Sequence, residues 1–436
     1  MEEENMYPSL QFPKKLMVYP NGFSVAQKFN KRIFLNQINE TAFEILSLCN
    51  GANTINDIAN KMAEKYSVSF VEAFKNVQEF IEYSIQIGTI TVLEESMYND
   101  LHILGSNDYW LPQVISIELT YKCPLFCKHC YRECSMKRTE TISLDEINKI
   151  ANEMEEYGIF SVQLTGGEPL AHPYFEEIID IFVKKNICVI VLTSGYYLRE
   201  NQLEIFKKHA DKIGSVQVSL DGLEHTHNFI RQKRNSYDRA INLTKFLIKQ
   251  GIQVDISTSV INQTREELYE LSLRLRQLGV SRHRLSVIVE TGRSTKNKVA
   301  TFNRETVINH WTKEFDKELG SDTFKVMLQE GDPAESSIEG NCGAGYKLIR
   351  IDPDLNIHPC VMIDLPLMNL KKNTLLDYAV KYSRFFDNIE MPGDKHCSGC
   401  PLEYKCKGCM AEAIINKFEV EFCNWDENVG STLLKL

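Results

Sequence analysis

The chain has 436 residues, of which 43% are hydrophobic and 25% charged, and its net charge is −10. The length allows about three domains, the composition is that of a globular protein, and the acidic balance argues against nucleic acid or an anionic membrane as the main partner. No stretch offers the roughly 18 uninterrupted apolar residues of a membrane span, and the acidic start MEEENMYPSL is no secretory signal. We therefore expect a cytoplasmic protein whose thirteen cysteines are metal ligands or reactive thiols rather than disulfides.

Residues 1–95 are predicted to form a small module of strands and helices. FSVAQK and RIFLNQ are strand-like, and a helix follows with Asn39 as its N-cap and Gly51 as its stop. TINDIANKMAEKY is a second helix, an apolar stripe from Phe70 to Ile85 marks a third, and GTITVLEE closes as a strand. The order resembles a winged-helix module. With 8 Lys and Arg against 12 Asp and Glu, a DNA-reading face is poorly supported, and a purely structural cap is the alternative.

Residues 96–112 are mixed and polar, which predicts a linker. From 113 to about 320, strand-like and helix-like segments alternate six times, which predicts an α/β domain with a parallel sheet, open or curled as a partial (β/α)6 TIM barrel. In such folds the chemistry gathers at the carboxyl ends of the strands. A C-terminal domain is expected over 321–436, because from about residue 340 Cys, Gly and Pro replace the alternation, as in regions organised by metal.

The first predicted strand ends in CPLFCKHCY, which spaces Cys123, Cys127 and Cys130 as CxxxCxxC. Three thiolates on one loop can hold three irons of a [4Fe–4S] cube and leave the fourth iron open. Zinc is the alternative. A structural zinc site needs four ligands, and only His129 or Cys134 could supply the fourth locally.

The second predicted strand ends in LTGGEP. Gly166 and Gly167 allow a close approach of the backbone to a ligand, and Glu168 supplies a carboxylate. CxxxCxxC on the first strand with GGE on the second resembles the radical S-adenosylmethionine enzymes over about residues 113–320. The resemblance implies that S-adenosylmethionine binds the open iron and that one electron from the cluster cleaves it, giving a 5′-deoxyadenosyl radical that abstracts a substrate hydrogen. It also implies an electron donor such as flavodoxin or ferredoxin.

The same resemblance implies which residues contact the cofactor. In chain order these are His129 and Tyr131 beside the adenine, Gly166, Gly167 and Glu168 at the methionine amine, Ser194 at the end of the third strand, Ser219 and Asp221 at the ribose or carboxylate, and Arg231 at the methionine carboxylate. For Ser194, Asp221 and Arg231, strand-end capping or a surface ion pair is the alternative. Gly292 and Arg293, after the sixth strand, either touch cofactor or peptide or belong to an ordinary loop.

The C-terminal region contains seven cysteines whose spacing resembles the SPASM extension of peptide-modifying radical S-adenosylmethionine enzymes. That resemblance implies two auxiliary [4Fe–4S] clusters. Cys397, Cys400, Cys406 and Cys423 would bind the distal cluster, and Cys342, Cys360 and Cys409 the proximal one. Two departures are visible: Leu355 stands where the family usually has Gly, and the last spacing in the CSGCPLEYKCKGC segment is two residues rather than three.

A fourth protein ligand for the proximal cluster is not evident. CGAGYKLIRIDPDLN contains no second Cys and no His, and His358 lies awkwardly close to Cys360. We expect an open iron, with an oxygen or nitrogen ligand from elsewhere as the alternative. An open iron could bind a substrate thiolate, since metals deprotonate thiols readily.

The N-terminal block also resembles the PqqD-like leader-recognition domain of ribosomal peptide maturases. The resemblance implies that a leader peptide adds a strand to the RIFLNQ edge, beside the helix that carries the Phe70–Ile85 stripe.

Together these features predict a thioether synthase of the sactipeptide or ranthipeptide kind, acting on a ribosomal precursor peptide. Carbon–carbon crosslinking or epimerisation of a peptide, a small-molecule substrate, and a DNA-binding iron–sulfur sensor are the alternatives. Cys49 and Cys188 are expected in cores, and Cys134 as a spectator.

Overall fold

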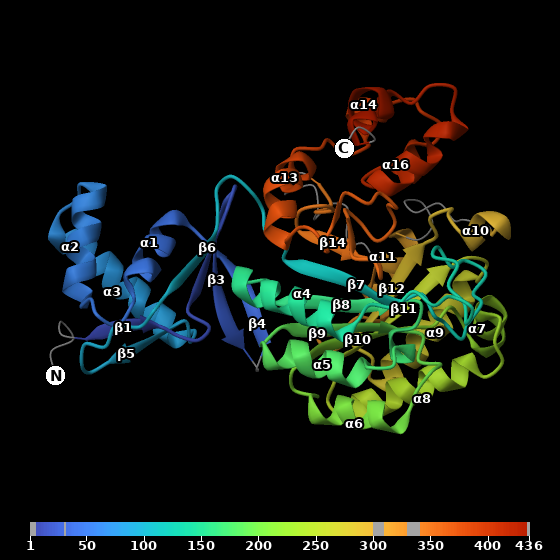
Figure 1. Ribbon diagram of the computed structural model, residues 1–436, viewed down its shortest axis with the longest axis horizontal. Coiled ribbons are helices and arrows are strands. Elements are labelled where there is room, and N and C mark those ends of the chain that lie inside the picture. The colour runs from blue at the N-terminus through green and yellow to red at the C-terminus, as the bar shows by residue number, and fades with distance from the viewer. Residues whose placement is uncertain (1–5, 30–31, 300–308, 329–340, 434–436) are drawn as a thin grey trace. The chain divides into compact units, whose positions relative to one another are not determined.

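A computed structural model describes residues 6–29, 32–299, 309–328 and 341–433. The chain divides into two compact units (Figure 1). The first comprises residues 1–111 and 154–160, and the second comprises residues 112–153 and 161–436.

The first unit combines small sheets with three helices. Its elements are β1 (Tyr7–Leu10), β2 (Lys15–Tyr19), β3 (Gly22–Phe29), β4 (Arg32–Ile38), α1 (Glu40–Leu48), α2 (Ile55–Tyr66), α3 (Phe70–Gln86), β5 (Ile90–Leu93) and β6 (His102–Gly105). One sheet has the order β4-β3-β2-β6, and β1 pairs separately with β5. The expected strands and helices are present. Strand β6, which pairs in parallel with β2, lies in residues predicted to be a linker. The winged-helix assignment itself stays a prediction.

Local sequence determines where the first two helices begin. The side-chain oxygen of Asn39 accepts a hydrogen bond from the backbone N–H of Ala42 at 2.8 Å, as predicted for an N-cap. At the start of α2, Thr54 and Asp57 form a capping box, in which each side chain accepts from the other residue's backbone N–H. These bonds satisfy N–H groups that the helices cannot pair internally.

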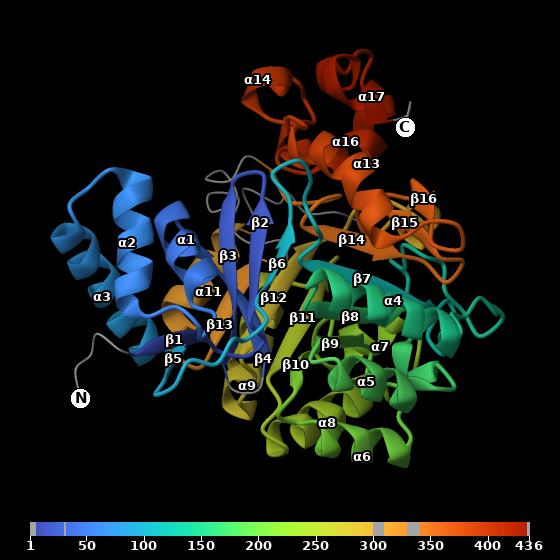
Figure 2. The same cartoon turned by 60° about the vertical axis from the view of Figure 1, so that its left-hand side comes forward.

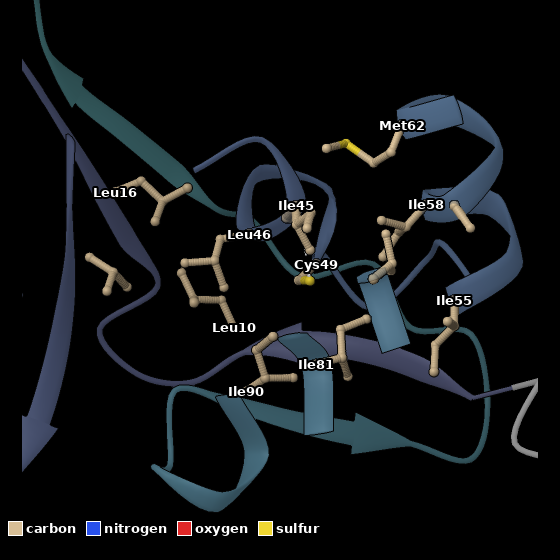
Figure 3. Packing of buried hydrophobic residues seen from close by; sticks show 13 residues of the cluster. Leu10, Leu16, Ile45, Leu46, Cys49, Ile55, Ile58, Met62, Ile81 and Ile90 are labelled. Carbon is tan, nitrogen blue, oxygen red and sulfur yellow. Dashed lines mark hydrogen bonds between the residues drawn. The ribbon is translucent and has the colours of Figure 1, made fainter. Parts of the chain in front are cut away.

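The core of the first unit lies between its helices and strands (Figure 3). Cys49 is fully buried there, which confirms its expected place in a core. On α3, Val77 and Ile81 are each 1% exposed, whereas Phe70 and Ile85 are 42% and 41% exposed. The middle of the predicted apolar stripe therefore builds the core, while its two ends stay on the surface of this unit.

Strand β4, which contains the RIFLNQ segment, is an edge of the four-stranded sheet. It pairs antiparallel with β3 along its whole length. Within the described residues its other side has no strand partner, and Phe34 on it is 46% exposed. An edge strand presents unpaired backbone donors and acceptors, which is what pairing with an added strand requires.

The second unit is built on a ten-stranded sheet. Its strands are β7 (Val114–Thr120), β8 (Ser161–Gly166), β9 (Cys188–Thr193), β10 (Ile213–Ser219), β11 (Val254–Val260), β12 (Arg282–Val287), β13 (Lys325–Leu328), β14 (Leu348–Ile351), β15 (Asn356–His358) and β16 (Met368–Asn369). Their order is β13-β12-β11-β10-β9-β8-β7-β14-β15-β16. Pairing is parallel from β13 to β14 and antiparallel from there to β16. Strands β7 to β12 are the six of the predicted partial barrel; β13 and β14 flank them (Figure 2).

Helices of the second unit follow the strands as the alternation predicted. They are α4 (Leu144–Tyr157), α5 (Phe175–Lys184), α6 (Glu200–Lys208), α7 (Glu224–Arg231), α8 (Ser236–Lys249), α9 (Arg265–Leu278), α10 (Arg293–Lys296), α11 (Asn309–Leu319), α13 (Leu375–Asp387), α14 (Asp394–Cys397), α15 (Glu403–Cys406), α16 (Met410–Asn416) and α17 (Ser431–Leu433), with single turns at Pro169–Ala171, Lys417–Glu419 and Asp426–Gly430. Helix α5 packs on β9, and α8 packs on β10 and β11. In the described part of the chain, no helix has the length and apolar character to cross a membrane.

Burial along the barrel strands separates two faces of the sheet. In β9, Val189 and Val191 are fully buried, whereas Ile190 and Leu192 are partly exposed. Successive side chains of a strand point to opposite faces. One face therefore lies beneath the helices, and the other is the more open inner face. Cys188, expected in a core, is on this inner face and half-buried.

Candidate active site

The loop after β7 carries the CxxxCxxC cysteines. Cys123 and Cys127 are each 7% exposed, Cys130 is half-buried, and all three share one cluster with the buried Cys134. Burial raises the pKa of Cys123 and of Cys127. A hydrogen bond donated by Cys134 lowers the pKa of Cys130. The loop thus gathers thiols where little water is present to stabilise their charge, so a cation that binds thiolates would be strongly favoured there.

The two glycines of GGE press directly against the cluster loop. The N–H of Gly167 donates to the carbonyl oxygen of Thr120 at 2.6 Å. A Cβ on Gly167 would lie 2.6 Å from the carbonyl oxygen of Lys122, and one on Gly166, at φ +124°, would collide with Thr120. No larger residue fits either position without moving the loop.

Glu168 is fully buried at the end of β8. Its Oε1 accepts from the Thr193 hydroxyl at 2.5 Å and from the N–H of Leu170 at 3.2 Å, and its Oε2 accepts from the N–H of Ser194 at 2.9 Å and from the Ser194 hydroxyl. Burial raises the pKa of Glu168. The predicted residues Glu168 and Ser194 are thus brought together, with Ser194 orienting the carboxylate.

Asp221, Arg231 and His129 form a second group beside the cluster loop. The Oδ2 of Asp221 lies 2.6 Å from Nε of Arg231, and Nη1 of Arg231 donates to Sγ of Cys127 at 3.7 Å. The Nε2 of His129 lies 4.0 Å from the same carboxylate oxygen. Arg231, expected at a cofactor carboxylate, pairs with the protein's own Asp221, in a buried rather than a surface ion pair. Burial lowers the pKa of His129 to about 4, so its ring is neutral near pH 7.

Tyr131 and Ser219 lie at the same carboxyl edge of the sheet. Tyr131 follows the third cysteine, and its ring centroid is 5.1 Å from the guanidinium carbon of Arg132. Ser219 is the last residue of β10, is half-buried, and is in register with Ser257 of β11. Both predicted residues are therefore at the end of the barrel where the cluster loop lies.

Arg293 has a larger structural role than its sequence indicated. It is 6% exposed. Its N–H donates to the carbonyl oxygen of Cys130 at 3.1 Å, its Nε to that of Cys127 at 2.9 Å, and its Nη1 to that of Cys134 at 3.0 Å. Asn297 donates to the carbonyl oxygen of Lys128 at 2.8 Å. The segment after β12 therefore holds the backbone of the cluster loop, and no local sequence motif predicts this role.

The four cysteines expected at the distal cluster influence one another. Burial raises the pKa of Cys397, and the thiols of Cys400 and Cys423 add to that shift. Burial raises the pKa of Cys406 to about 12, with Cys397 and Cys400 again contributing. Cys397 and Cys406 are buried, and Cys400 and Cys423 are half-buried.

The cysteines expected at the proximal cluster are less closely defined. Burial raises the pKa of Cys360, with the Cys342 thiol adding to the shift; Cys342 itself is exposed. Cys409 is the N-cap residue of α16, and its N–H donates to the carbonyl oxygen of Cys406 at 2.9 Å. His358, the nearby alternative ligand, is 2% exposed and has its Nε2 3.0 Å from Oδ2 of Asp352. That imidazole nitrogen is engaged, whereas Nδ1 of His358 is buried without a hydrogen-bond partner in the structure, so His358 stays an alternative ligand.

The residues at the end of β7 fit an iron–sulfur cluster with a bound cofactor. In the described ranges, no three His, Cys, Asp or Glu side chains gather as they would around one metal ion. In a [4Fe–4S] cube each cysteine binds a different iron, so the sulfurs need not converge on one point. The Nδ1 of His129 is buried without a hydrogen-bond partner in the structure, which leaves it available to a ligand at this edge.

Comparison with known proteins agrees with this geometry. Residues 117–275 match the model of the Radical SAM superfamily. The chain carries a radical SAM domain. Residues 33–90 match the model of coenzyme PQQ synthesis protein D (PqqD), so the chain also carries a PqqD-like domain. It is an enzyme that uses S-adenosylmethionine and a [4Fe–4S] cluster, as its superfamily implies.

Individual relatives extend the similarity over most of this radical SAM enzyme. It is 26% identical over 407 residues to the antilisterial bacteriocin subtilosin biosynthesis protein AlbA of Bacillus subtilis, covering 90% of this chain and 88% of AlbA. It is 25% identical over 279 residues to the sporulation killing factor maturation protein SkfB of the same species, covering 64% of this chain and 67% of SkfB. The crystal structure of Streptococcus suis SuiB bound to S-adenosylmethionine has a TM-score of 0.66 at 16% identity and covers 97% of both chains, which shows a shared fold.

Proposed function

We propose that this enzyme forms a thioether crosslink between a cysteine sulfur and a carbon of a ribosomal precursor peptide. Its similarity to a bacteriocin biosynthesis protein and to a killing factor maturation protein supports a peptide substrate. So does its likeness in fold to SuiB, which has been crystallised with the precursor peptide SuiA. The PqqD-like domain supports leader recognition.

The observation that carries the thioether is the grouping of the C-terminal cysteines. Cys397 and Cys400 lie on one turn, closed by a 2.8 Å hydrogen bond from the N–H of Cys400 to the carbonyl oxygen of Cys397, while Cys342 precedes β14 and Cys360 follows β15. If the four cysteines expected at the distal cluster bind that cluster, Cys342, Cys360 and Cys409 remain for a proximal cluster with one open iron. An open iron there would bind the substrate thiolate.

The reaction balances as an oxidation of the peptide. The peptide loses one hydrogen atom from carbon to the 5′-deoxyadenosyl radical and one proton from the thiol. The electron released as the carbon–sulfur bond forms would be accepted by the proximal cluster that Cys342, Cys360 and Cys409 would hold. For this chemistry Cys123, Cys127 and Cys130 would hold the radical SAM cluster. Gly166, Gly167 and Glu168 would hold the methionine amine, and His129 would lie at the adenine.

The leader peptide would bind to the open edge of β4. That edge has no strand partner among the described residues. An extended peptide can add there by backbone hydrogen bonds. Proline at Phe34 and, separately, at Leu35 would test this, because neighbouring N–H groups of a strand point in opposite directions. One of the two variants should fold and lose affinity for the leader, while Ala at the same two positions should retain it.

Two measurements test the function as a whole. Anaerobically reconstituted enzyme should hold about twelve irons per chain, as three four-iron clusters require. A count near eight would mean that one auxiliary cluster is absent. Mass spectrometry of the modified precursor should show a loss of two hydrogens and one alkylation-resistant cysteine per crosslink. A product whose thiols can all be alkylated would reject the thioether and favour carbon–carbon crosslinking or epimerisation.

A further inference from the structure

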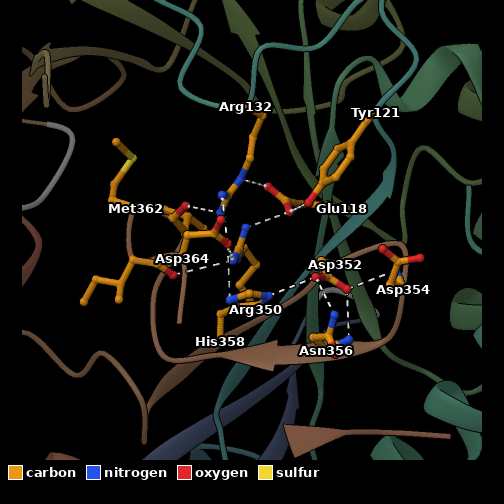
Figure 4. A network of polar contacts seen from close by, with 12 residues as sticks. Glu118, Tyr121, Arg132, Arg350, Asp352, Asp354, Asn356, His358, Met362 and Asp364 are labelled. Carbon is orange, nitrogen blue, oxygen red and sulfur yellow. Dashed lines mark hydrogen bonds and ion pairs between the residues drawn. The ribbon is translucent and has the colours of Figure 1, made fainter. Parts of the chain in front are cut away.

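A buried ion pair joins the first strand of the barrel to the first strand of the C-terminal extension. Glu118 on β7 and Arg350 on β14 both have fully buried side chains, and Nη1 of Arg350 lies 2.9 Å from Oε2 of Glu118 (Figure 4). The two strands are parallel neighbours, with Arg350 in register with Ser116. Glu118 is two residues further along, on the same face as Ser116, so the contact follows from the strand pairing.

Arg132 extends this pair to both cysteine loops. It follows the third cysteine of the radical SAM motif, Cys130, by two residues. Its Nε donates to Oε1 of Glu118 at 2.9 Å, and its Nη2 donates to the carbonyl oxygen of Val361 at 2.8 Å. Val361 is the residue after Cys360. One side chain therefore reaches from the radical SAM loop to the loop of an expected auxiliary-cluster ligand.

Asp364 closes the network from the side of the Cys360 loop. Its Oδ1 lies 3.1 Å from Nη2 of Arg350 and 3.4 Å from Nη1 of Arg132. It is also 3.6 Å from Nδ1 of His358. Its side chain is 75% exposed, whereas Arg132 and Arg350 are almost completely buried. The two guanidinium groups thus lie between one buried carboxylate and one exposed carboxylate.

Hydrogen bonds between β7 and β14 already hold the strands together, so the ionic groups are not needed for that purpose. Burying charges is costly, and a buried ion pair is weak evidence for stability. A fixed charge close to a cluster acts on its reduction, because the reduced cluster carries one more negative charge. Positive charge favours the reduced form, and negative charge opposes it. Hydrogen bonds and charges around the ligands are known means by which proteins adjust such potentials.

We propose that Glu118, Arg132, Arg350 and Asp364 form an ionic bridge that fixes the Cys360 loop against the Cys130 loop and sets the reduction potential of the cluster bound through Cys360. The four are positioning residues: they act on the cluster through its ligand loops. The inference rests on the proposed function, in which Cys360 binds the proximal cluster.

The test uses Arg132→Gln, Asp364→Asn and a matched control, Asp354→Asn. Asp354 is an exposed carboxylate between β14 and β15, and its contacts in the structure are made by its backbone. Each full-length variant is reconstituted anaerobically, its iron is counted, and its clusters are titrated by electron paramagnetic resonance. At the wild-type midpoint we expect Arg132→Gln to lower the reduced-to-oxidised ratio of one auxiliary cluster by about threefold or more, and Asp364→Asn to raise it. Asp354→Asn should leave it unchanged.

A lower reduced-to-oxidised ratio in Arg132→Gln and a higher ratio in Asp364→Asn, at unchanged iron content, support the bridge. If both variants titrate like the Asp354 control while holding about twelve irons, the inference is wrong and the proposed function stands. If the wild-type enzyme holds only about four irons, the ionic-bridge inference and the proposed function are both wrong. If Arg132→Gln does not fold, the comparison of Asp364→Asn with the Asp354→Asn control is by itself the test of the bridge. In cluster-free enzyme, Cys360 should also react several-fold faster with iodoacetamide in Arg132→Lys than in Asp354→Asn, since lysine cannot make the forked contact.

Discussion

Nε of Arg293 donates a hydrogen bond to the carbonyl oxygen of Cys127 over 2.9 Å, which ties the segment after β12 to the loop after β7. Two further bonds from the same residue reach the carbonyl oxygens of Cys130 and Cys134. The shape of the cluster loop therefore depends on a residue more than 150 positions away in the chain.

Arg293→Ala should disorganise that loop. Two buried carbonyl groups would lose charged donors, which costs about 2–4 kcal/mol in total. We expect the iron content to fall by about four atoms per chain, as the loss of one four-iron cluster requires. The matched control is Arg274→Ala, because Arg274 is 54% exposed and its partners, Glu270 and Tyr237, lie outside the cluster loop. Equal iron in both variants would contradict the role given to Arg293.

Glu168→Gln should weaken S-adenosylmethionine binding without removing the cluster. The amide would place a donor against groups that already donate, such as the N–H of Ser194, and it carries no charge for an amine. Loss of one charge-assisted hydrogen bond corresponds to about a 10- to 100-fold rise in Kd. Equilibrium dialysis of the reconstituted enzyme measures this, with Glu177→Gln as a surface control. An unchanged Kd would place the amine elsewhere.

Leu355 stands where the resemblance to SPASM extensions predicts glycine, and its φ is +70°. This left-handed conformation costs a residue with a side chain about 1–2 kcal/mol. The side chain is only 4% exposed, however, and removing a buried leucine costs about 2–5 kcal/mol. Leu355→Gly should therefore be net destabilising, and Leu355→Ala more so, because alanine keeps the strained backbone. Chemical denaturation of the three proteins gives the order, and a more stable glycine variant would show that the strain dominates.

Stability should fall on acidification because buried histidines are held neutral. Burial lowers the pKa of His283 to about 3, between Thr258 and Ser272. In the unfolded chain the pKa of His283 is about 6.5. Between pH 3 and pH 6.5 only the unfolded chain therefore binds the proton, and the contribution of His283 to the free energy of unfolding is lost as the pH falls below 6.5. From pH 7 to 5.5 this residue should cost about 1 kcal/mol. His283→Gln should show a correspondingly smaller change in urea midpoint, and an identical change in both proteins would refute the assignment.

Patterns local in the chain predicted much of the fold. The alternation of strand-like and helix-like segments predicted the six barrel strands, and the Asn39 cap marked the start of α1. Gly166 and Gly167 were predicted to allow a close approach of the backbone to a ligand, and in the structure they lie against the backbone of the cluster loop. Each of these features depends on residues close in sequence, or on burial of one face of a helix or strand.

Features that depend on distant pairing were not predictable in this way. Strand β6 lies in a polar stretch and exists because β2, far earlier in the chain, offers an edge. Arg293 follows a strand like many loop residues, and only the folded chain shows its targets. Glu118 gave a usable signal: a carboxylate within the apolar strand VISIELT needs a buried partner. The identity of that partner, Arg350, could come only from the pairing of β7 with β14.

The pairing of β14 with β7 also limits how this enzyme can be rebuilt. The extension contributes the strand that covers the outer edge of the barrel's first strand. A truncation before β14 would leave that edge open, and open edges invite aggregation. Chimeras that exchange extensions between such enzymes should therefore join the parents after β14 rather than before it, so that each barrel keeps its native neighbour.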